Sequence, residues 1–495
     1  MRYLSTRDNT VKFRAARAIA QGLSREGGLF VPEAFPAISE EDIIRFTGMT
    51  YAELAVFVMK LYLDDYSEIE MTEYASQAYG KPGFDHPDVA PVRLIDDRTA
   101  ILELWHGPTC AFKDMALQML PHLLSAALDK TEEAKDVCIL VATSGDTGKA
   151  ALDGFRDVKR TKIMVFYPED GVSDIQRLQM VTQEGGNVGV SAVTGNFDDA
   201  QSGVKAIFSD ETLRAELDKK GYFLSSANSI NWGRLLPQIV YYISAYCNIV
   251  KAGGIIPGEP INFCVPTGNF GNILAGYYAK KMGLPIGRLI CASNSNDVLT
   301  EFIETGVYNK NRAFVTTISP SMDILISSNL ERLLFDLSGN DDRLIAGYMK
   351  ALADEGKYEV SQAIKAGLRE NIDCGKCSDT KTKETIKEVF DTYRYLIDTH
   401  TAVAFNVLSD YRLRTGDTTK TIVVSTASPF KFCESVLSAL GEQSGFGGLE
   451  LIDRLEEVSG AAGPAPLKAL RGKEVRFKGC VKNDGMRSAV ESFLF

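Results

Sequence analysis

The sequence has few of the side chains and segments that mark several large classes of protein. It contains only 4 histidines, none in a metal-ligand spacing, and no serine in a G-x-S-x-G turn. The net charge is -11 without a long basic run, which argues against binding to nucleic acid or an anionic membrane. No run of about 18 apolar residues exists, and residues 1–10 lack the apolar core of a signal peptide. We therefore expect a cytoplasmic protein without a bound metal, whose chemistry belongs to an organic cofactor.

The 9 cysteines are scattered and odd in number. Cys138 and Cys264 lie in apolar runs typical of buried strands, which suits reduced thiols in a cytosol. Cys374 and Cys377 form the only close pair, with no second pair or histidines nearby. The surrounding segment 374–385 is polar and rich in lysine, so the sequence predicts an exposed loop there and not a zinc site.

The overall composition is that of an ordinary globular protein, with 45% hydrophobic and 24% charged residues. A chain of 495 residues is too long for one compact core, so we expect about two or three domains. Residues 1–90 read as mainly helical, with 51–63 the clearest amphipathic stretch, and Lys-Pro-Gly at 81–83 marks a boundary. Beyond it short apolar strands alternate with helices, which predicts α/β domains with largely parallel sheets. The strands are expected at 92–95, 99–105, 137–142, 162–167, 187–193, 261–265, 288–292 and 421–425, and helices at 115–128, 148–155 and 272–282.

The first informative turn is VPTGNFGN at 265–272, between an apolar strand and a helix. Its glycines free the backbone for unusual conformations and leave amide hydrogens uncovered. The helix that follows adds its partial positive charge at the same place, so the turn could cradle a phosphate without a basic side chain. A tight turn with a simple helix cap is the alternative.

The second turn is TSGDTGK at 143–149, again between a strand and a helix. It is not a Walker A loop, because a threonine replaces the first glycine and an alanine follows the lysine. The hydroxyls of Ser144 and Thr147, with free backbone amides, could hold a substrate carboxylate. Asp146 would repel such an anion, and capping the helix is its alternative role.

The third segment is WHGPTCAFKD at 105–114, where Lys113 stands between Phe112 and Asp114. Burial would lower the pKa of this amine and leave it able to condense with an aldehyde, although a lone lysine is ordinarily a solvated charge. A pyridoxal phosphate enzyme needs such a lysine, a phosphate cup and a partner for the pyridine nitrogen. Thr426, at the end of a late strand, offers a hydroxyl for the last task. The conjunction predicts pyridoxal phosphate bound covalently to Lys113.

These motifs resemble those of the threonine synthase family of pyridoxal phosphate enzymes, over nearly the whole chain. The resemblance rests on segments 3–7, 27–32, 106–114, 142–148, 228–232, 268–272 and 321–325. Two positions depart from the pattern: Ser428 stands where many members carry a histidine, and Asp146 where the wider β-family carries an asparagine.

The resemblance implies an α/β protein of PLP fold type II (tryptophan synthase β-like), with two parallel-sheet domains and a mainly helical N-terminal domain. The expected ranges are 1–90 for the N-terminal domain, 91–124 and 241–495 for the large cofactor-binding domain, and 125–240 for the smaller domain. The protein would be a monomer or a homodimer.

The resemblance also implies a lyase of threonine biosynthesis that converts O-phospho-L-homoserine and water into L-threonine and phosphate, with Lys113 moving the protons. The implied cofactor-binding residues are Lys113, Gly268, Asn269, Phe270, Gly271, Asn272 and Thr426. The implied substrate-binding residues are Ser144, Asp146, Thr147, Lys149, Asn228, Ser229, Asn231 and Arg234, where the last four form the preferred site for the leaving phosphate and Lys149 is a second candidate.

Three alternatives remain open at this point. A phospho-lyase on the same scaffold would release a 2-oxo acid instead. A non-catalytic binding protein could keep the same fold, although both the lysine and the phosphate turn are intact. A phosphotransferase built around Gly145 is disfavoured by the failed Walker pattern.

Overall fold

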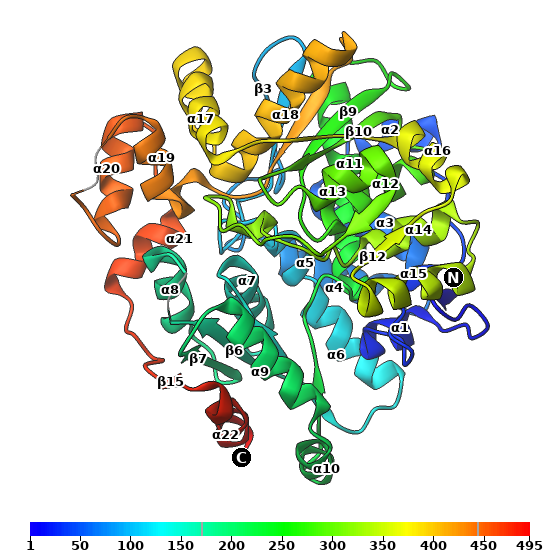
Figure 1. The fold of residues 1–495 in the computed structure, drawn as a ribbon, viewed down its shortest axis with the longest axis vertical. Helices are drawn as coiled ribbons and strands as arrows, with labels where there is room; N and C mark the ends of the chain where they lie inside the picture. Colours follow the sequence, from blue (N-terminus) through cyan, green and yellow to red (C-terminus); the bar gives the residue numbers. More distant parts are fainter. Residues whose placement is uncertain (170–171, 443–444) are drawn as a thin grey trace.

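The computed structural model describes residues 1–169, 172–442 and 445–495, and it contains two largely parallel sheets with helices on their faces (Figure 1). The larger sheet has the strand order β13-β10-β9-β14-β4-β3, and only β3 runs antiparallel to its neighbour. Its strands are β3 (Val92–Leu94), β4 (Thr99–Glu103), β9 (Ile261–Pro266), β10 (Ile286–Ser293), β13 (Ile372–Lys376) and β14 (Thr421–Ser425).

The smaller sheet is entirely parallel, with the order β15-β7-β6-β5-β8. Its strands are β5 (Asp136–Ala142), β6 (Thr161–Pro168), β7 (Val188–Val193), β8 (Tyr222–Ser225) and β15 (Cys480–Val481). Continuous apolar strands of this kind need helices on both faces, so the alternating pattern of the sequence leads directly to this architecture. The predicted α/β fold with parallel sheets is confirmed.

The end of the chain lies on the smaller sheet. The sequence placed all of 241–495 in the larger domain, but β15 pairs in parallel with β7. The helix α22 (Met486–Leu494) follows it and buries Met486 and Val490 in the core of the smaller sheet. The two residues of β15 are too short to give a strand signal in the sequence, so only the folded chain reveals this return.

The N-terminal part is mainly helical, as predicted, with a small antiparallel pair of strands, β1 (Tyr3–Ser5) and β2 (Phe30–Pro32). Ser39, Thr50 and Ser67 each form a capping box at a helix start, which satisfies the free amides of the first turn. The helices are α1 (Ala15–Gln21), α2 (Glu40–Phe46), α3 (Tyr51–Tyr62) and α4 (Glu68–Tyr79).

The helix α11 (Trp232–Lys251) lies close to α12 and α13 in Figure 1 and is buried along most of its length. It packs against α3, α5 (Asp114–Leu117) and α12 (Gly271–Lys281), and so joins the N-terminal part to the cofactor turns predicted from the sequence. The helix expected at 115–128 is divided into α5 and α6 (Leu120–Lys130), and Pro121 stands in the first turn of α6, where a missing amide costs nothing.

The remaining helices cover the two sheets and extend the C-terminal part. They are α7 (Asp146–Phe155), α8 (Asp174–Val181), α9 (Phe197–Ser209), α10 (Glu211–Lys219), α13 (Val298–Thr305), α14 (Leu330–Leu337), α15 (Asp342–Asp354), α16 (Gln362–Asn371), α17 (Asp379–Tyr393), α18 (Thr399–Thr415), α19 (Cys433–Ala439), α20 (Glu450–Ser459) and α21 (Ala465–Lys468), and a small antiparallel pair is formed by β11 (Val307–Asn309) and β12 (Lys357–Glu359).

The prediction of an exposed loop at 374–385 is wrong. Cys374 lies in β13, opposite Cys291 of β10, and α17 begins soon afterwards. Thr382 and Thr385 are buried on one face of α17, one helical turn apart. Threonine and lysine do not look like a core-facing pattern in the sequence, which is why the periodicity was hidden.

No helix among the described residues is long and apolar enough to cross a membrane. The described residues also contain no group of three or more side chains that could together hold a metal ion.

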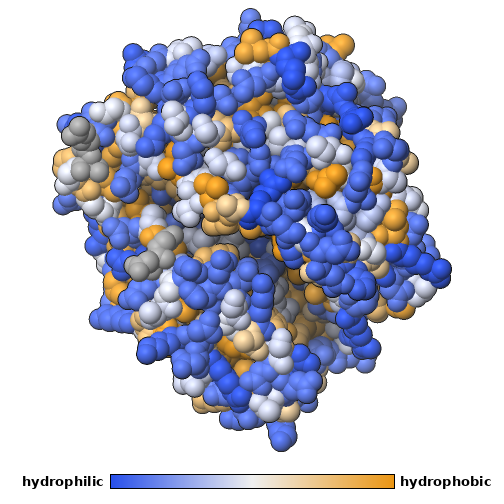
Figure 2. All heavy atoms as spheres, viewed as in Figure 1, coloured by the Kyte–Doolittle hydropathy of each residue, from blue (hydrophilic) through white to orange (hydrophobic). Residues whose placement is uncertain are grey.

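The larger sheet brings the predicted cofactor residues together. β9, β14 and β4 are adjacent and parallel, so the turns that follow them leave the sheet at one edge. The turn at 267–270, Thr426 and the loop that ends at Lys113 follow these three strands. The molecular surface is hollowed near the centre of the face seen in Figure 2.

Arg332 joins the N-terminal part to the rest of the molecule. Its side chain is completely buried and donates to the backbone oxygens of Phe30 (3.0 Å) and Ile230 (2.6 Å) and to Asn329 Oδ1. A lysine cannot satisfy three acceptors that a planar guanidinium reaches together. We predict that Arg332→Lys lowers the free energy of unfolding by about 2–3 kcal/mol, measured by denaturant titration.

Arg343 provides the matched control, because it is exposed. Arg343→Lys is expected to change the free energy of unfolding by less than about 0.5 kcal/mol. Equal effects of the two substitutions would contradict the role given to Arg332.

Candidate active site

Lys113 is held in place by backbone pairing with the segment that follows β14. Leu104 N donates to Ser425 O at 3.0 Å, Phe112 N to Thr426 O at 2.8 Å, and Ser428 N to Cys110 O at 3.1 Å. The bond at Leu104 continues the parallel pairing of β4 with β14, whereas residues 110–112 return to pair antiparallel with 426–428. This pairing fixes Lys113 close to Thr426 along the backbone, although the two residues are far apart in the sequence.

The Lys113 side chain is only 10% exposed, and its ammonium lies 3.9 Å from Asp146 Oδ2 and 4.9 Å from the centre of the Phe112 ring. Burial is the largest influence and lowers the pKa of this amine to about 8. Asp146 opposes that effect, whereas the positive charges of Arg234 and Lys431 add to it. A much larger fraction of Lys113 is therefore uncharged near neutral pH than of an ordinary lysine.

The turn between β9 and α12 has the geometry of an anion cup. Phe270 adopts a left-handed conformation with φ of 64° directly before the first residue of α12. Asn272 Oδ1 accepts from the hydroxyls of Tyr241 and Tyr242 at 2.7 and 2.8 Å. These two bonds fix the amide, yet its buried Nδ2 has no partner among the described residues. A buried donor without an acceptor is costly, so this nitrogen fits a ligand oxygen.

The turn before α7 is stabilised by Thr143, whose Oγ1 accepts from the amides of Gly145 and Gly148 at 3.0 and 2.9 Å. The helix-capping role considered for Asp146 is thus filled by Thr143. The Asp146 carboxylate is instead buried, and Gln176 Nε2 donates to its Oδ1 at 2.9 Å.

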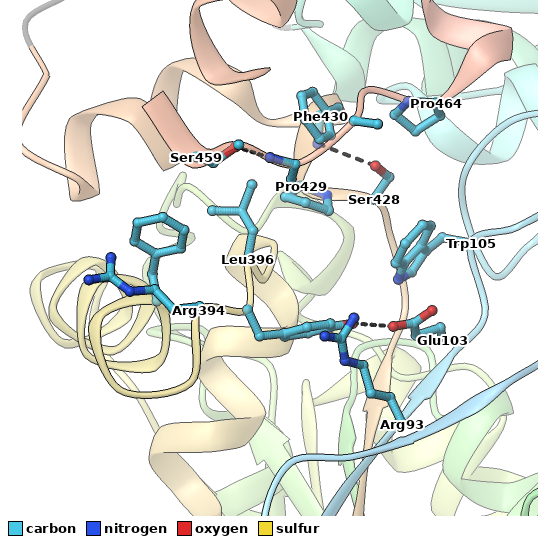
Figure 3. Close-up of a pocket in the computed structure, with 15 residues that line it drawn as sticks. Arg93, Glu103, Trp105, Arg394, Leu396, Ser428, Pro429, Phe430, Ser459 and Pro464 are labelled. Atoms are coloured by element: carbon cyan, nitrogen blue, oxygen red, sulfur yellow. Dashed lines mark hydrogen bonds between the residues drawn. The ribbon is translucent and has the colours of Figure 1, made fainter. Parts of the chain in front are cut away.

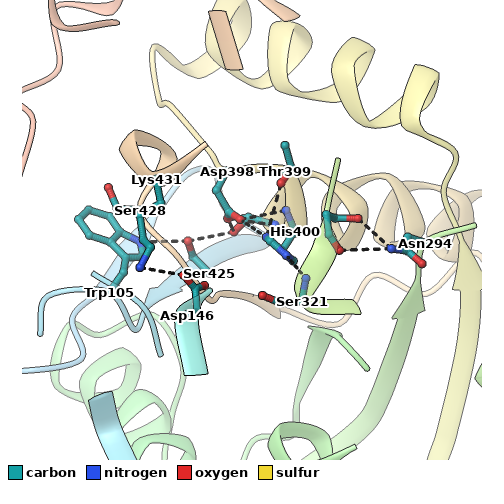
Figure 4. A network of polar contacts seen from close by, with 12 residues as sticks. Trp105, Asp146, Asn294, Ser321, Asp398, Thr399, His400, Ser425, Ser428 and Lys431 are labelled. Atoms are coloured by element: carbon teal, nitrogen blue, oxygen red, sulfur yellow. Dashed lines mark hydrogen bonds and ion pairs between the residues drawn. The ribbon is translucent and has the colours of Figure 1, made fainter. Parts of the chain in front are cut away.

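Asp146 is paired with Lys431, a residue that the sequence analysis did not identify (Figure 4). Lys431 Nζ lies 2.8 Å from Asp146 Oδ1 and also donates to Thr109 O at 2.8 Å. Burial opposes the charge of Asp146, but Lys431 and Lys113 outweigh it, so the pKa of the carboxyl lies well below its usual range. The only sequence signal for Lys431 is its position between Phe430 and Phe432, similar to that of Lys113 beside Phe112.

Arg234 is buried in the first turn of α11, near Lys113. Its guanidinium donates to Ala227 O and forms an ion pair with none of the carboxylates that the structure describes. Burial lowers its pKa to about 10, so it stays charged at neutral pH. An unpaired buried cation is expensive unless an anion joins it.

The other residues predicted to bind substrate differ in whether their polar atoms already have partners in the protein. Asn231 caps α11 through Gly233 N and donates to Ile19 O, so its two polar atoms are occupied. Lys149 is committed to Asp153 at 3.2 Å and to Gln183. Asn228 is exposed, whereas Ser144, Thr147 and Ser229 are half-buried, and Ser229 Oγ accepts from Asn329 Nδ2 at 3.2 Å.

Known proteins resemble this chain along its whole length. A family described as "Pyridoxal-phosphate dependent enzyme" matches residues 100–427, and families described as the threonine synthase N terminus and C-terminal match residues 2–79 and 401–493. The threonine synthase of Pseudomonas aeruginosa is 40% identical over 440 residues, covering 89% of this chain and 90% of that protein. The chain belongs to the threonine synthase family.

Two further relatives are matched over different shares of their own length. "Threonine synthase-like 1" of Homo sapiens is 40% identical over 86% of this chain, but the match covers only 58% of the human protein. The crystal structure of pyridoxal phosphate-bound threonine synthase from Brucella melitensis has a TM-score of 0.88 and 35% identity, and covers 100% of this chain and 98% of that one. The predicted family and fold type are thereby confirmed.

Pyridoxal phosphate is the cofactor of this family, and the residues present fit it. The buried Lys113 amine suits its aldehyde, and the unpartnered Asn272 Nδ2 beside the left-handed Phe270 suits its phosphate. Gly268 is closely packed, because a Cβ there would lie 2.9 Å from Ser321 O. The assignments of Asn269, Gly271 and Thr426 remain predictions that this arrangement favours.

A separate cavity of about 320 Å³ is lined in part by residues 428–430 (Figure 3). Arg93, Trp105 and Tyr395 line it, together with Glu103, which accepts from the Tyr395 hydroxyl at 2.6 Å. Lys113 does not line this cavity, so it is not the site of the cofactor.

Gly145 is required by close packing at the Asp146 turn. Its φ is 141°, and a Cβ there would lie 2.5 Å from the amide of Gln176. We predict that Gly145→Ala displaces Gln176 and lowers the free energy of unfolding by about 1–3 kcal/mol, measured by denaturant titration. Gly253→Ala is the control, because Gly253 also has positive φ (71°) but open space around it. If both variants lose the same stability, backbone strain alone explains the effect.

Proposed function

We propose that this chain is a pyridoxal phosphate-dependent lyase that converts O-phospho-L-homoserine and water into L-threonine and phosphate. The observation that carries the proposal is the buried Lys113, whose lowered pKa of about 8 suits an amine that must bond and carry protons. Membership of the threonine synthase family supports the reaction. A cytoplasmic location and a monomeric or homodimeric state stay predictions of the sequence.

Lys113 is the residue that moves protons. When bound, pyridoxal phosphate supplies an aldehyde and an electron-accepting ring. Lys113 would hold the cofactor through that aldehyde, and its Nζ, when not so bonded, would take the proton from the substrate Cα and, in turn, from Cβ. Phosphate leaves Cγ, and water then adds at Cβ. The Lys113 amine returns the protons to the substrate. Because Lys113 is buried, bulk water has little access to the protons that this amine transfers.

Thr426 suits the pyridine nitrogen, because it lies beside the Lys113 loop at the end of β14. A hydroxyl is a neutral partner and does not hold a proton on the ring as a carboxylate would. We expect this arrangement to limit charge delocalisation into the ring and to favour elimination.

Arg234 is our choice for the substrate phosphate. It is buried, charged and without a carboxylate partner among the described residues, whereas Lys149 already pairs with Asp153. A guanidinium can bind a phosphate through two parallel hydrogen bonds. Ser229, which lies 3.8 Å from the Cβ position of Gly271, adds a hydroxyl near the same turn.

We predict that the purified protein binds pyridoxal phosphate at Lys113 and that borohydride reduction leaves a permanent adduct on this residue, detected by peptide mass spectrometry. Lys113→Arg should show no adduct and at least about a thousandfold lower turnover, because guanidinium cannot act as the nucleophile. Equimolar threonine and phosphate from phosphohomoserine support the proposal. A 2-oxo acid product would identify a phospho-lyase, and no product would leave only a binding protein.

We predict that Arg234→Gln raises KM for phosphohomoserine by about ten- to a hundredfold, since it removes a charge-assisted bond worth roughly 1.5–3 kcal/mol. Lys149→Gln serves as the comparison, with a smaller expected change because Lys149 is already paired. Steady-state phosphate release measures both. A larger effect at Lys149 would assign the phosphate to that residue instead.

A further inference from the structure

The side chain of Lys431 is completely buried at the end of the short helix η2 (Pro429–Lys431). Its ammonium contacts Asp146, which begins α7 beside the smaller sheet, and the backbone oxygen of Thr109, in the loop that carries Lys113. Ser428 caps η2 through Phe430 N at 3.3 Å. One ammonium thus joins three segments that are distant in the sequence, and Figure 4 shows its contact with Asp146.

The two oxygens of Asp146 face different partners. Oδ1 accepts from Lys431 at 2.8 Å and from Gln176 at 2.9 Å, whereas Oδ2 lies 3.9 Å from Lys113 Nζ. The last distance is too long for a hydrogen bond. A carboxylate that close would ordinarily keep a buried lysine protonated and tie it down, so the engagement of Oδ1 matters to Lys113.

We propose that Lys431 is a positioning residue that occupies the Asp146 carboxylate and thereby leaves the Lys113 amine free to react with the cofactor. The inference rests on the proposed function, because it concerns the same lysine. It also explains how an acid is tolerated in a site that must accept anions: the charge of Asp146 is balanced by Lys431 before any ligand binds.

The charges around Lys113 are consistent with this role. Asp146 faces it from α7, Arg234 from α11 and Lys431 from η2, and Asp114 is its neighbour in the chain. Burial raises the pKa of Asp114 to about 7, so this carboxyl contributes less than a full negative charge near neutral pH. With Lys431 removed, Asp146 would face Lys113 as its main partner, and the pKa of Lys113 would rise.

A second acid on α7 does not alter this balance. Asp153 forms an ion pair with Lys149 at 3.2 Å, and it is not among the main influences on the pKa of Lys113. Lys431 also favours the charged form of Asp114, but the ion pair that it forms among the described residues is with Asp146.

The test measures how fast pyridoxal phosphate attaches to Lys113 as a function of pH. Full-length apoprotein is mixed with pyridoxal phosphate, trapped with borohydride at intervals, and the Lys113 peptide is quantified by mass spectrometry. Below its pKa the amine carries a proton and cannot condense. Lys431→Met should shift the midpoint of the rate profile upward by roughly one pH unit and slow attachment near neutral pH about tenfold.

Two further variants separate this role from a merely structural one. Lys431→Arg keeps the charge and should keep the midpoint near that of the unmodified protein. Asp146→Asn removes the carboxylate and should shift the midpoint downward, and the double variant with Lys431→Met should lose the upward shift. Damage to the fold would reduce attachment at every pH and would not move the midpoint in opposite directions.

The cofactor's own titration is the same in every sample, so only differences between variants are interpreted. An unchanged or lower midpoint in Lys431→Met overturns the inference. If that variant does not fold, Asp146→Asn decides, and a midpoint that fails to fall overturns it equally. Absence of attachment at Lys113 in the unmodified protein would instead refute the proposed function.

Discussion

β14 lies between β4 and β9, and this arrangement of three parallel strands determines where the functional side chains meet. Neighbouring parallel strands end at one edge of a sheet, so their turns share one space. Past the strand ends, residues 110–112 return and pair antiparallel with 426–428. Lys113 and Thr426 are therefore held by main-chain hydrogen bonds, which do not depend on which side chains lie beside them.

Burial then sets the charges inside that space. Burial disfavours the charged form of any group, because a charge is costly where there is little water. It therefore lowers the pKa of Lys113 and raises the pKa of Asp114. Asp146 stays ionised because two ammonium groups lie beside it. Arg234 adds a positive charge without a partner among the described carboxylates, so the site suits a ligand that brings phosphate.

Strong local patterns were predictable, and weak ones were not. The glycine-containing turns at 143–149 and 265–272 lie between a strand and a helix as expected, because apolar runs and glycines act locally. The segment 374–385 was predicted wrongly because its buried side chains are those of Cys377, Thr382 and Thr385 in a lysine-rich stretch. The pair β15–β7 depends on contacts between residues far apart in the chain, which periodicity cannot reveal.

The sequence by itself determined the fold class and the family and predicted Lys113 as the lysine that reacts, since each depends on short motifs whose chemistry is local. Only the tertiary structure decided which charges surround that lysine. Lys431 reaches Asp146 across segments separated by most of the chain, and Lys149, although adjacent to the turn, is directed to Asp153 instead. The pKa of a buried group depends on distances in space, and a sequence specifies those distances only through the complete fold.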